Sequence, residues 1–122
     1  MKIAIPVNDN NLNTDICPSF GRTAYFLIYD SETKESKFIE NIAANMAGGA
    51  GIKAAQIIID NGANVLLAIR LGQNAANVLK ASDIKIYKAN EGLAKDNIEA
   101  FRDGKLVSLD KFHAGFHGRG NR

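Results

Sequence analysis

Short apolar runs separated by polar and glycine-containing segments predict most of the strands. Residues 2–7 form a brief apolar run with β-branched side chains, which is typical of a buried strand. Residues 24–29 and 35–40 are strand-like and flank a polar turn, so we expect them to pair as an antiparallel hairpin. Residues 64–69 contain a continuous apolar run, as in strands that are buried on both faces.

Helical periodicity begins after the hairpin. Between residues 52 and 61 the polar side chains Lys53, Gln56 and Asp60 occupy one narrow stripe, so this helix must lie across a sheet. Gly62 can take a left-handed conformation and is expected to end the helix. The remaining expected elements are helices at 74–81 and 93–102, a strand at 84–87 and a last extended segment at 105–109.

A hairpin followed by alternating helices and strands predicts an α/β fold with a mixed five-stranded sheet and about three helices. If the second strand is antiparallel to the first, the third runs with the first, and the crossover helices make the fourth and fifth run that way too. The segments after these four strands, 8–19, 42–49, 70–73 and 88–92, then leave from one edge, which we call the rim. Ligands in open α/β sheets bind at this kind of edge, so the rim is the predicted site.

Composition and charge exclude several classes of protein. A chain of 122 residues with 46% hydrophobic and 23% charged residues fits one globular domain. No apolar run approaches the roughly 20 residues of a membrane helix, no signal peptide is evident, and a lone cysteine allows no internal disulfide. We therefore expect a cytoplasmic protein with no membrane partner. The positive charge that gives the net charge of +2 is concentrated after residue 104. Residues 1–104 therefore have no excess of basic side chains that would indicate binding of nucleic acid.

Residues 1–110 are expected to form a single domain, and the glycine-rich residues 111–122 a flexible tail. The tail carries His113 and His117. These histidines can wrap onto a metal site, or they can be solvated side chains of a basic tail. The sequence leaves both possibilities open.

A glycine-rich turn, Gly48-Gly49-Ala50-Gly51, precedes the helix at 52–61. The first backbone N–H groups of a helix have no partner within it, and the helix dipole adds partial positive charge, so such a turn suits an anion. The turn lacks the Gly-Lys-Ser/Thr ending of a Walker loop and the G-x-G-x-x-G fingerprint. Glycines here can also serve only to bring the helix close to the sheet.

Several side chains on the rim could take part in binding. Cys17 stands in a polar loop, and a soft thiolate suits iron–sulfur or copper(I) ligation. Arg22 can clamp an anion or can fix the loop to its own fold. Phe20 can be a lid over the rim or part of the core. The other members of the predicted rim are Asn45, Met46, Arg70, Gln73 and Asn74.

Three motifs occur in order along the chain: Cys17-Pro18-Ser19-Phe20-Gly21-Arg22, then Glu40-Asn41 leading to Gly48-Gly49-Ala50-Gly51, and then Leu71-Gly72-Gln73-Asn74-Ala75. In this order and spacing the chain resembles the dinitrogenase iron–molybdenum cofactor biosynthesis family, which includes NifX-type proteins and the C-terminal domain of NifB. The resemblance covers roughly residues 1–110. It departs at Ser19, where the family pattern commonly has histidine.

The resemblance implies a ribonuclease-H-like three-layer fold with sheet order 3-2-1-4-5 and strand 2 antiparallel. It also implies that the protein binds or carries an iron–sulfur or iron–molybdenum-type cofactor or its precursor, with a cofactor-assembly or acceptor protein as a possible partner. Cys17, Phe20, Arg22, Asn45, Gly48, Gly49, Gly51 and Asn74 are the expected cofactor-binding residues, with Cys17, His113 and His117 as expected metal ligands.

Two other functions were weighed from the residues. A ribonuclease-H-type nuclease needs several carboxylates around a metal pair, including one in the first strand, and residues 2–7 contain none. Both histidines lie in the tail, so no Ser/His/Asp set is evident, and we expect no enzymatic activity. The alternative is a regulatory module that binds a phosphate-bearing metabolite or nucleotide at the Gly48–Gly51 turn.

Overall fold

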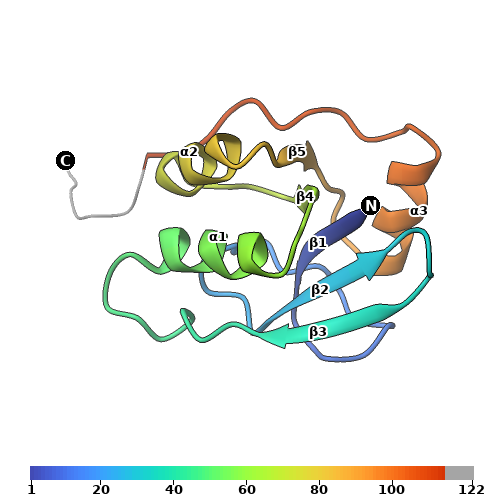
Figure 1. Ribbon diagram of the computed structural model, residues 1–122, viewed down its shortest axis with the longest axis horizontal. Helices are drawn as coiled ribbons and strands as arrows, with labels where there is room; N and C mark the ends of the chain where they lie inside the picture. The colour runs from blue at the N-terminus through green and yellow to red at the C-terminus, as the bar shows by residue number, and fades with distance from the viewer. Residues whose placement is uncertain (115–122) are drawn as a thin grey trace.

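Five strands form one mixed sheet in the computed structural model, which describes residues 1–114 (Figure 1). The strand order is β3-β2-β1-β4-β5, with β2 antiparallel to both neighbours and with β1, β4 and β5 parallel. The elements are β1 (Lys2–Val7), β2 (Tyr25–Asp30), β3 (Ser36–Glu40), α1 (Ala50–Asp60), β4 (Val65–Ala68), α2 (Gln73–Ala81), β5 (Lys85–Lys88) and α3 (Ala94–Arg102). The α/β class, the strand order and the three helices predicted from the sequence are confirmed.

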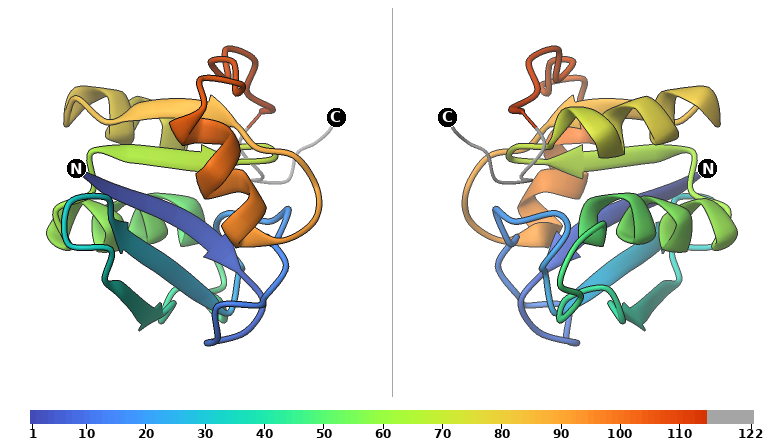
Figure 2. Two further views of the ribbon diagram at one scale, coloured as in Figure 1. Left: turned by 90° about the vertical axis from the view of Figure 1, so that its right-hand side faces the viewer. Right: turned by 90° about the vertical axis from the view of Figure 1, so that its left-hand side faces the viewer.

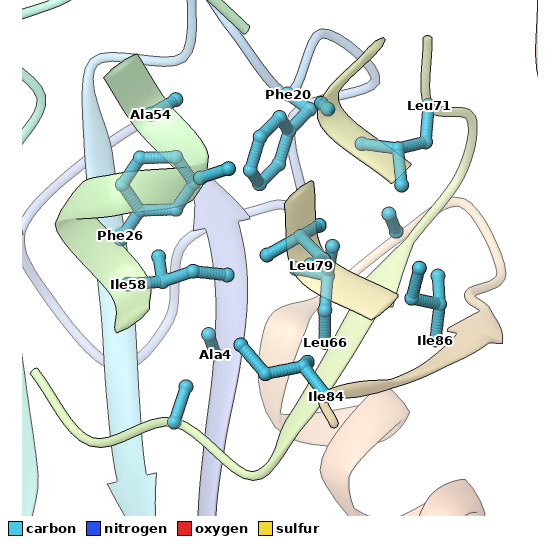
Figure 3. Close-up of a cluster of buried hydrophobic side chains, with 14 of the residues drawn as sticks. Ala4, Phe20, Phe26, Ala54, Ile58, Leu66, Leu71, Leu79, Ile84 and Ile86 are labelled. Carbon is cyan, nitrogen blue, oxygen red and sulfur yellow. The ribbon is translucent and has the colours of Figure 1, made fainter. Parts of the chain in front are cut away.

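The sheet is the middle of three layers, with α1 and α2 on one face and α3 on the other (Figures 1 and 2). Alternate residues of a strand point to opposite faces, and both faces are apolar here. On β1, Ala4 faces the core beneath α1 and α2, whereas Ile3 and Ile5 face the core beneath α3. Figure 3 shows the larger cluster, in which side chains of α1, α2 and the strands interlock.

Helix α1 begins at Ala50, two residues before the predicted start at residue 52. The residue that precedes the helix is Gly49, not Gly51. Gly49 has a φ of 73°, in the left-handed region that favours glycine. Gly51 therefore lies within the first turn of α1. A Cβ on Gly51 would lie 3.6 Å from Cβ of Ala75 in α2, so the two helices are packed closely side by side at this point.

The chain continues along the domain after α3. The expected extended segment pairs with β5, since the Lys88 N–H donates to Val107 O at 2.8 Å and the Leu109 N–H to Ile86 O at 3.0 Å. Phe112 then packs against the core beneath α1 and α2. The structure thus places the first residues of the predicted tail on the domain, whereas residues 115–122, including His117, lie outside the described residues.

Candidate functional site

The loops of the predicted rim gather at one end of the sheet, on the side away from the N-terminus (Figure 2). The parallel strands β1, β4 and β5 all end here, as does β3. The loop after β3 leads into the first turn of α1, and the loop after β4 leads into α2. The strand directions therefore bring together the segments that were expected to share an edge.

Cys17 lies just beyond the carboxyl end of β1. Its backbone N–H donates to the carbonyl oxygen of Pro6 at 2.8 Å, while the neighbouring N–H of Ile16 donates to Gly92 at 2.8 Å. These bonds hold the backbone of Cys17 between the ends of β1 and the segment that precedes α3. The side chain is a free thiol and is half-buried.

Phe20 is part of the core. Its side chain is 4% exposed, and its ring centroid lies 5.3 Å from that of Phe26 on β2. In Figure 3 the two rings lie near one another beneath the helices. Of the two roles considered from the sequence, core and lid, the structure shows the first, so Phe20 supports the neighbouring Gly21 and Arg22 from beneath.

Gly21 lies directly against the first turn of α1. A Cβ on Gly21 would lie 3.1 Å from the amide nitrogen of Gly51 and 3.2 Å from its Cα. Contacts this short force a shift, and here both partners are backbone atoms. Any larger residue at position 21 would move the segment after Cys17 and the first turn of α1 apart by a few tenths of an ångström.

The guanidinium of Arg22 holds the loop between β3 and α1. Its Nη1 donates to the carbonyl oxygens of Ala44 and Met46, both at 2.9 Å. Arginine has five N–H donors, so these two bonds leave donors for another acceptor. The side chain is exposed at the rim, and Arg22 can hold the loop and face a bound anion at the same time.

The first turn of α1 has no capping side chain among the described residues. The first N–H that bonds within the turn is that of Lys53, which donates to Gly49 O at 3.0 Å, so the N–H groups of Ala50, Gly51 and Ile52 precede the helical ladder. A Cβ on Gly48 or Gly49 would meet no atom within 4 Å, so there is free space beside these two glycines, whereas Ala50 is buried and Gly51 is half-buried. The other two helices differ, because the first N–H of each donates to a loop carbonyl.

His113 joins the rim beside α2. Its backbone pairs with the segment before that helix, since its N–H donates to Leu71 O at 3.2 Å and its carbonyl accepts from the Gln73 N–H at 2.9 Å. Its ring lies over Gly72, where an added Cβ would be 3.2 Å from Cε1. Asn74 follows on α2 and is exposed, as is Asn45 in the loop before α1.

The donor set of the rim restricts what it can hold. No group of three or more His, Cys, Asp or Glu side chains that could hold a metal ion occurs within residues 1–114. The rim offers backbone amides, the Cys17 thiol and the His113 imidazole instead, with two guanidinium groups. Its charged side chains in these segments are Arg22, Arg70, Lys88, Asp9, Asp15 and Glu91. Such a set suits a preassembled anion of large size better than a bare metal ion, which needs several side-chain ligands.

Sequence reasoning missed two residues of this region. Asn41, which is 4% exposed, bonds to both rim segments, and the Thr23 hydroxyl donates to Val7 O at 2.7 Å. Asn41 stands in one of the motifs that carried the family resemblance, and this was the available signal. None of the described helices has the length and apolar character needed to cross a bilayer.

Three layers around a mixed sheet of order β3-β2-β1-β4-β5 place the chain in the class of small three-layer α/β domains. The chain is a member of the family described as Dinitrogenase iron-molybdenum cofactor, which matches residues 1–104. This confirms the family that the sequence motifs indicated.

Individual relatives agree with this assignment. An uncharacterized protein of Methanocaldococcus jannaschii is 37% identical over 113 residues, which covers 90% of this chain and 92% of that protein. The apo form of the orange protein from Desulfovibrio gigas has a TM-score of 0.85 and 34% identity, with 88% of this chain and 92% of that chain covered. A putative NifB protein from Thermotoga has a TM-score of 0.81 and 34% identity, with coverages of 91% and 95%.

Proposed function

We propose that this protein is a non-catalytic carrier of an iron–sulfur or iron–molybdenum-type cofactor, or of its precursor, and that it holds this cargo at the rim. The observation that carries the proposal is the first turn of α1, whose first three N–H groups precede the helical ladder, together with Arg22, which is bonded to the loop that leads into this turn. Membership of a family associated with iron–molybdenum cofactor supports the nature of the cargo. The orange protein, described in an apo form, agrees with a binding role.

The cargo is held mainly by its negative charge. Metal–sulfur clusters are anionic, and the amides of the Gly48–Gly51 turn offer hydrogen bonds at the positive end of the α1 dipole. Arg22 adds a full positive charge at the loop that precedes α1. No acidic residue occurs between Asn41 and Ile59, so no carboxylate of this segment opposes an anion.

Cys17 supplies the one covalent attachment. A single thiolate cannot hold a conventional four-thiolate cluster, but it can bind one iron of a cluster that arrives assembled. His113, held beside α2 by backbone bonds, is the auxiliary ligand within the described residues, and His117 in the remaining tail is a second candidate. Asn45 and Asn74 are exposed at the rim and can donate to sulfur or oxygen atoms of the cargo.

Weak, reversible attachment suits a carrier. One thiolate and a set of hydrogen bonds leave most of the cluster surface available to the protein that receives it. The acceptor is accordingly a cofactor-assembly protein, and transfer would proceed by exchange of ligands at the exposed side of the cluster.

Anaerobic transfer of an iron–sulfur cluster to the pure protein tests the proposal. Absorbance and iron analysis should show uptake by the wild type and a clear loss of uptake in Cys17→Ala. Glu99→Ala, on the exposed side of α3, is the matched control and should behave as the wild type. No uptake by the wild type, or uptake that Cys17→Ala leaves unchanged, would contradict the proposal.

A phosphate-bearing metabolite or nucleotide is the alternative cargo, since the same open amides would accept a phosphate. A thermal-shift screen with nucleotides separates the two possibilities. A ligand at about 100 times its dissociation constant stabilises the folded state by roughly 2.7 kcal/mol, which raises the melting temperature measurably. A positive nucleotide result without cluster uptake would favour the alternative.

A further inference from the structure

The side chain of Asn41 joins two segments of the rim from within the protein. Its Nδ2 donates to the carbonyl oxygens of Gly21 at 3.0 Å and Thr23 at 2.9 Å. Its Oδ1 accepts from the N–H of Ala43 at 3.1 Å. The residue is 4% exposed, so water has little access to replace these bonds.

These bonds connect the groups on which the proposed site depends. On one side, Asn41 fixes the peptide that links Gly21 to Arg22, and Gly21 in turn lies against the Gly51 amide. On the other side, it fixes Ala43, which is followed by Ala44, an acceptor for the Arg22 guanidinium. Asn41 is thus bonded to both of the segments that Arg22 connects at the surface.

Arg22 is not the only group that fixes this geometry. Its side chain is exposed, and its bonds to Ala44 and Met46 are accessible to water, which can compete for them. Of the three bonds of Asn41, those to Thr23 and Ala43 are buried and that to Gly21 is part-buried. They hold the loop in place whichever acceptor Arg22 takes.

We propose that Asn41 is a positioning residue of the rim, which sets the placement of Arg22 relative to the first turn of α1 and thereby determines how tightly an anionic cluster is held. This inference rests on the proposed function. The cause is geometric: the Asn41 amide orients the Gly21 carbonyl, and Gly21 touches the helix turn that carries the amides. Supporting residues of this kind commonly change metal affinity by about 10- to 100-fold.

Asn61, which follows the last residue of α1, provides the control. Its Nδ2 donates to Ile57 O at 2.8 Å in a part-buried bond. This end of α1 leads into the start of β4 and lies away from the rim, and the bond reaches neither Gly21 nor Ala43.

The test compares the affinities of Asn41→Ala and Asn61→Ala for an iron–sulfur cluster in anaerobic titrations. Both proteins are first shown to be folded by circular dichroism. We expect Asn41→Ala to bind roughly 10- to 100-fold more weakly than the wild type and Asn61→Ala to keep the wild-type affinity. Unchanged affinity in Asn41→Ala, or an equal loss in both variants, would overturn the positioning role.

A second measurement needs no cluster and uses the milder variants Asn41→Ser and Asn61→Ser. Nitrogen–proton correlation spectra of the cluster-free proteins should show shifted amide resonances for Ala50, Gly51 and Ile52 only in Asn41→Ser. Unchanged resonances in that variant would overturn the positioning role independently of any binding data. Failure of the wild type to take up cluster would instead contradict the proposed function, so the two failures are distinguishable.

Discussion

Gly21 and Gly51 touch through their backbones: a Cβ on Gly21 would lie 3.1 Å from the Gly51 amide nitrogen. Contacts shorter than 3.4 Å are tighter than nine in ten real Cβ contacts. The segment that carries Arg22 is therefore packed directly against the first turn of α1. This contact explains why glycine stands between Phe20, which is buried, and Arg22, which is exposed.

Gly21→Ala should destabilise the protein, because the added methyl group must displace the first turn of α1. We expect the free energy of unfolding in urea to fall by about 1–3 kcal/mol, the usual cost of overpacking. Cluster affinity should fall as well, since the amides move relative to Arg22.

Gly48→Ala is the control for this substitution. A Cβ on Gly48 meets no atom within 4 Å, and its φ does not lie in the left-handed region. Its free energy of unfolding should stay within about 0.5 kcal/mol of the wild type. Equal destabilisation by the two substitutions would mean that the Gly21–Gly51 contact is not what constrains this position.

Phe112 should hold the last described residues of the chain against the domain. Its side chain packs against the core, and the Nζ of Lys80 lies 4.5 Å from its ring centroid. We expect Phe112→Ala to lower the free energy of unfolding by about 1–2 kcal/mol through lost apolar burial and a lost cation–π contact. Hydrogen exchange should also become faster at Gln73, whose N–H donates to the His113 carbonyl. Lys111→Ala, at an exposed neighbour, should change neither quantity.

Asp30 should make stability depend on pH at the opposite end of the sheet. The Glu32 N–H donates to its carboxylate at 2.9 Å and holds the pKa of Asp30 below its ordinary value of 3.8. Because the pKa is lowered on folding, the stabilisation is present above 3.8 and is lost as the pH falls through the lower folded value. Urea unfolding should therefore show a steeper loss of stability below 3.8 in the wild type than in Asp30→Asn. If the free energy of unfolding falls equally with pH in both proteins, this hydrogen bond does not contribute to the pH dependence of stability.

The sheet could be predicted because the direction of each strand follows from its connections. A hairpin reverses the chain and a crossover helix restores the direction, so the placement of four loops on one edge follows from element order alone. Element ends were less certain. Gly48, Gly49 and Gly51 all permit a helix start, and only the left-handed φ of 73° at Gly49 shows that α1 begins at Ala50.

The candidate site could be predicted only in outline. The partners of Arg22, the burial of Phe20 and the bonds of Asn41 depend on contacts between segments that are far apart in the sequence. Glycine content suggested a tail from residue 111, but Phe112 and His113 are held by the core and by backbone bonds. The binding roles of Cys17 and the other rim residues stay predictions.

The position of a bound cluster tests the central claim most directly. Nitrogen–proton correlation spectra of the protein, recorded before and after anaerobic loading with an iron–sulfur cluster, report this position because paramagnetic iron broadens the resonances of nearby nuclei. The proposed site predicts broadening confined to residues 17–22, 45–52 and 72–74 and to His113, with the resonances of α3 unchanged. Broadening centred on α3 or on the turn between β2 and β3 would contradict binding at the rim.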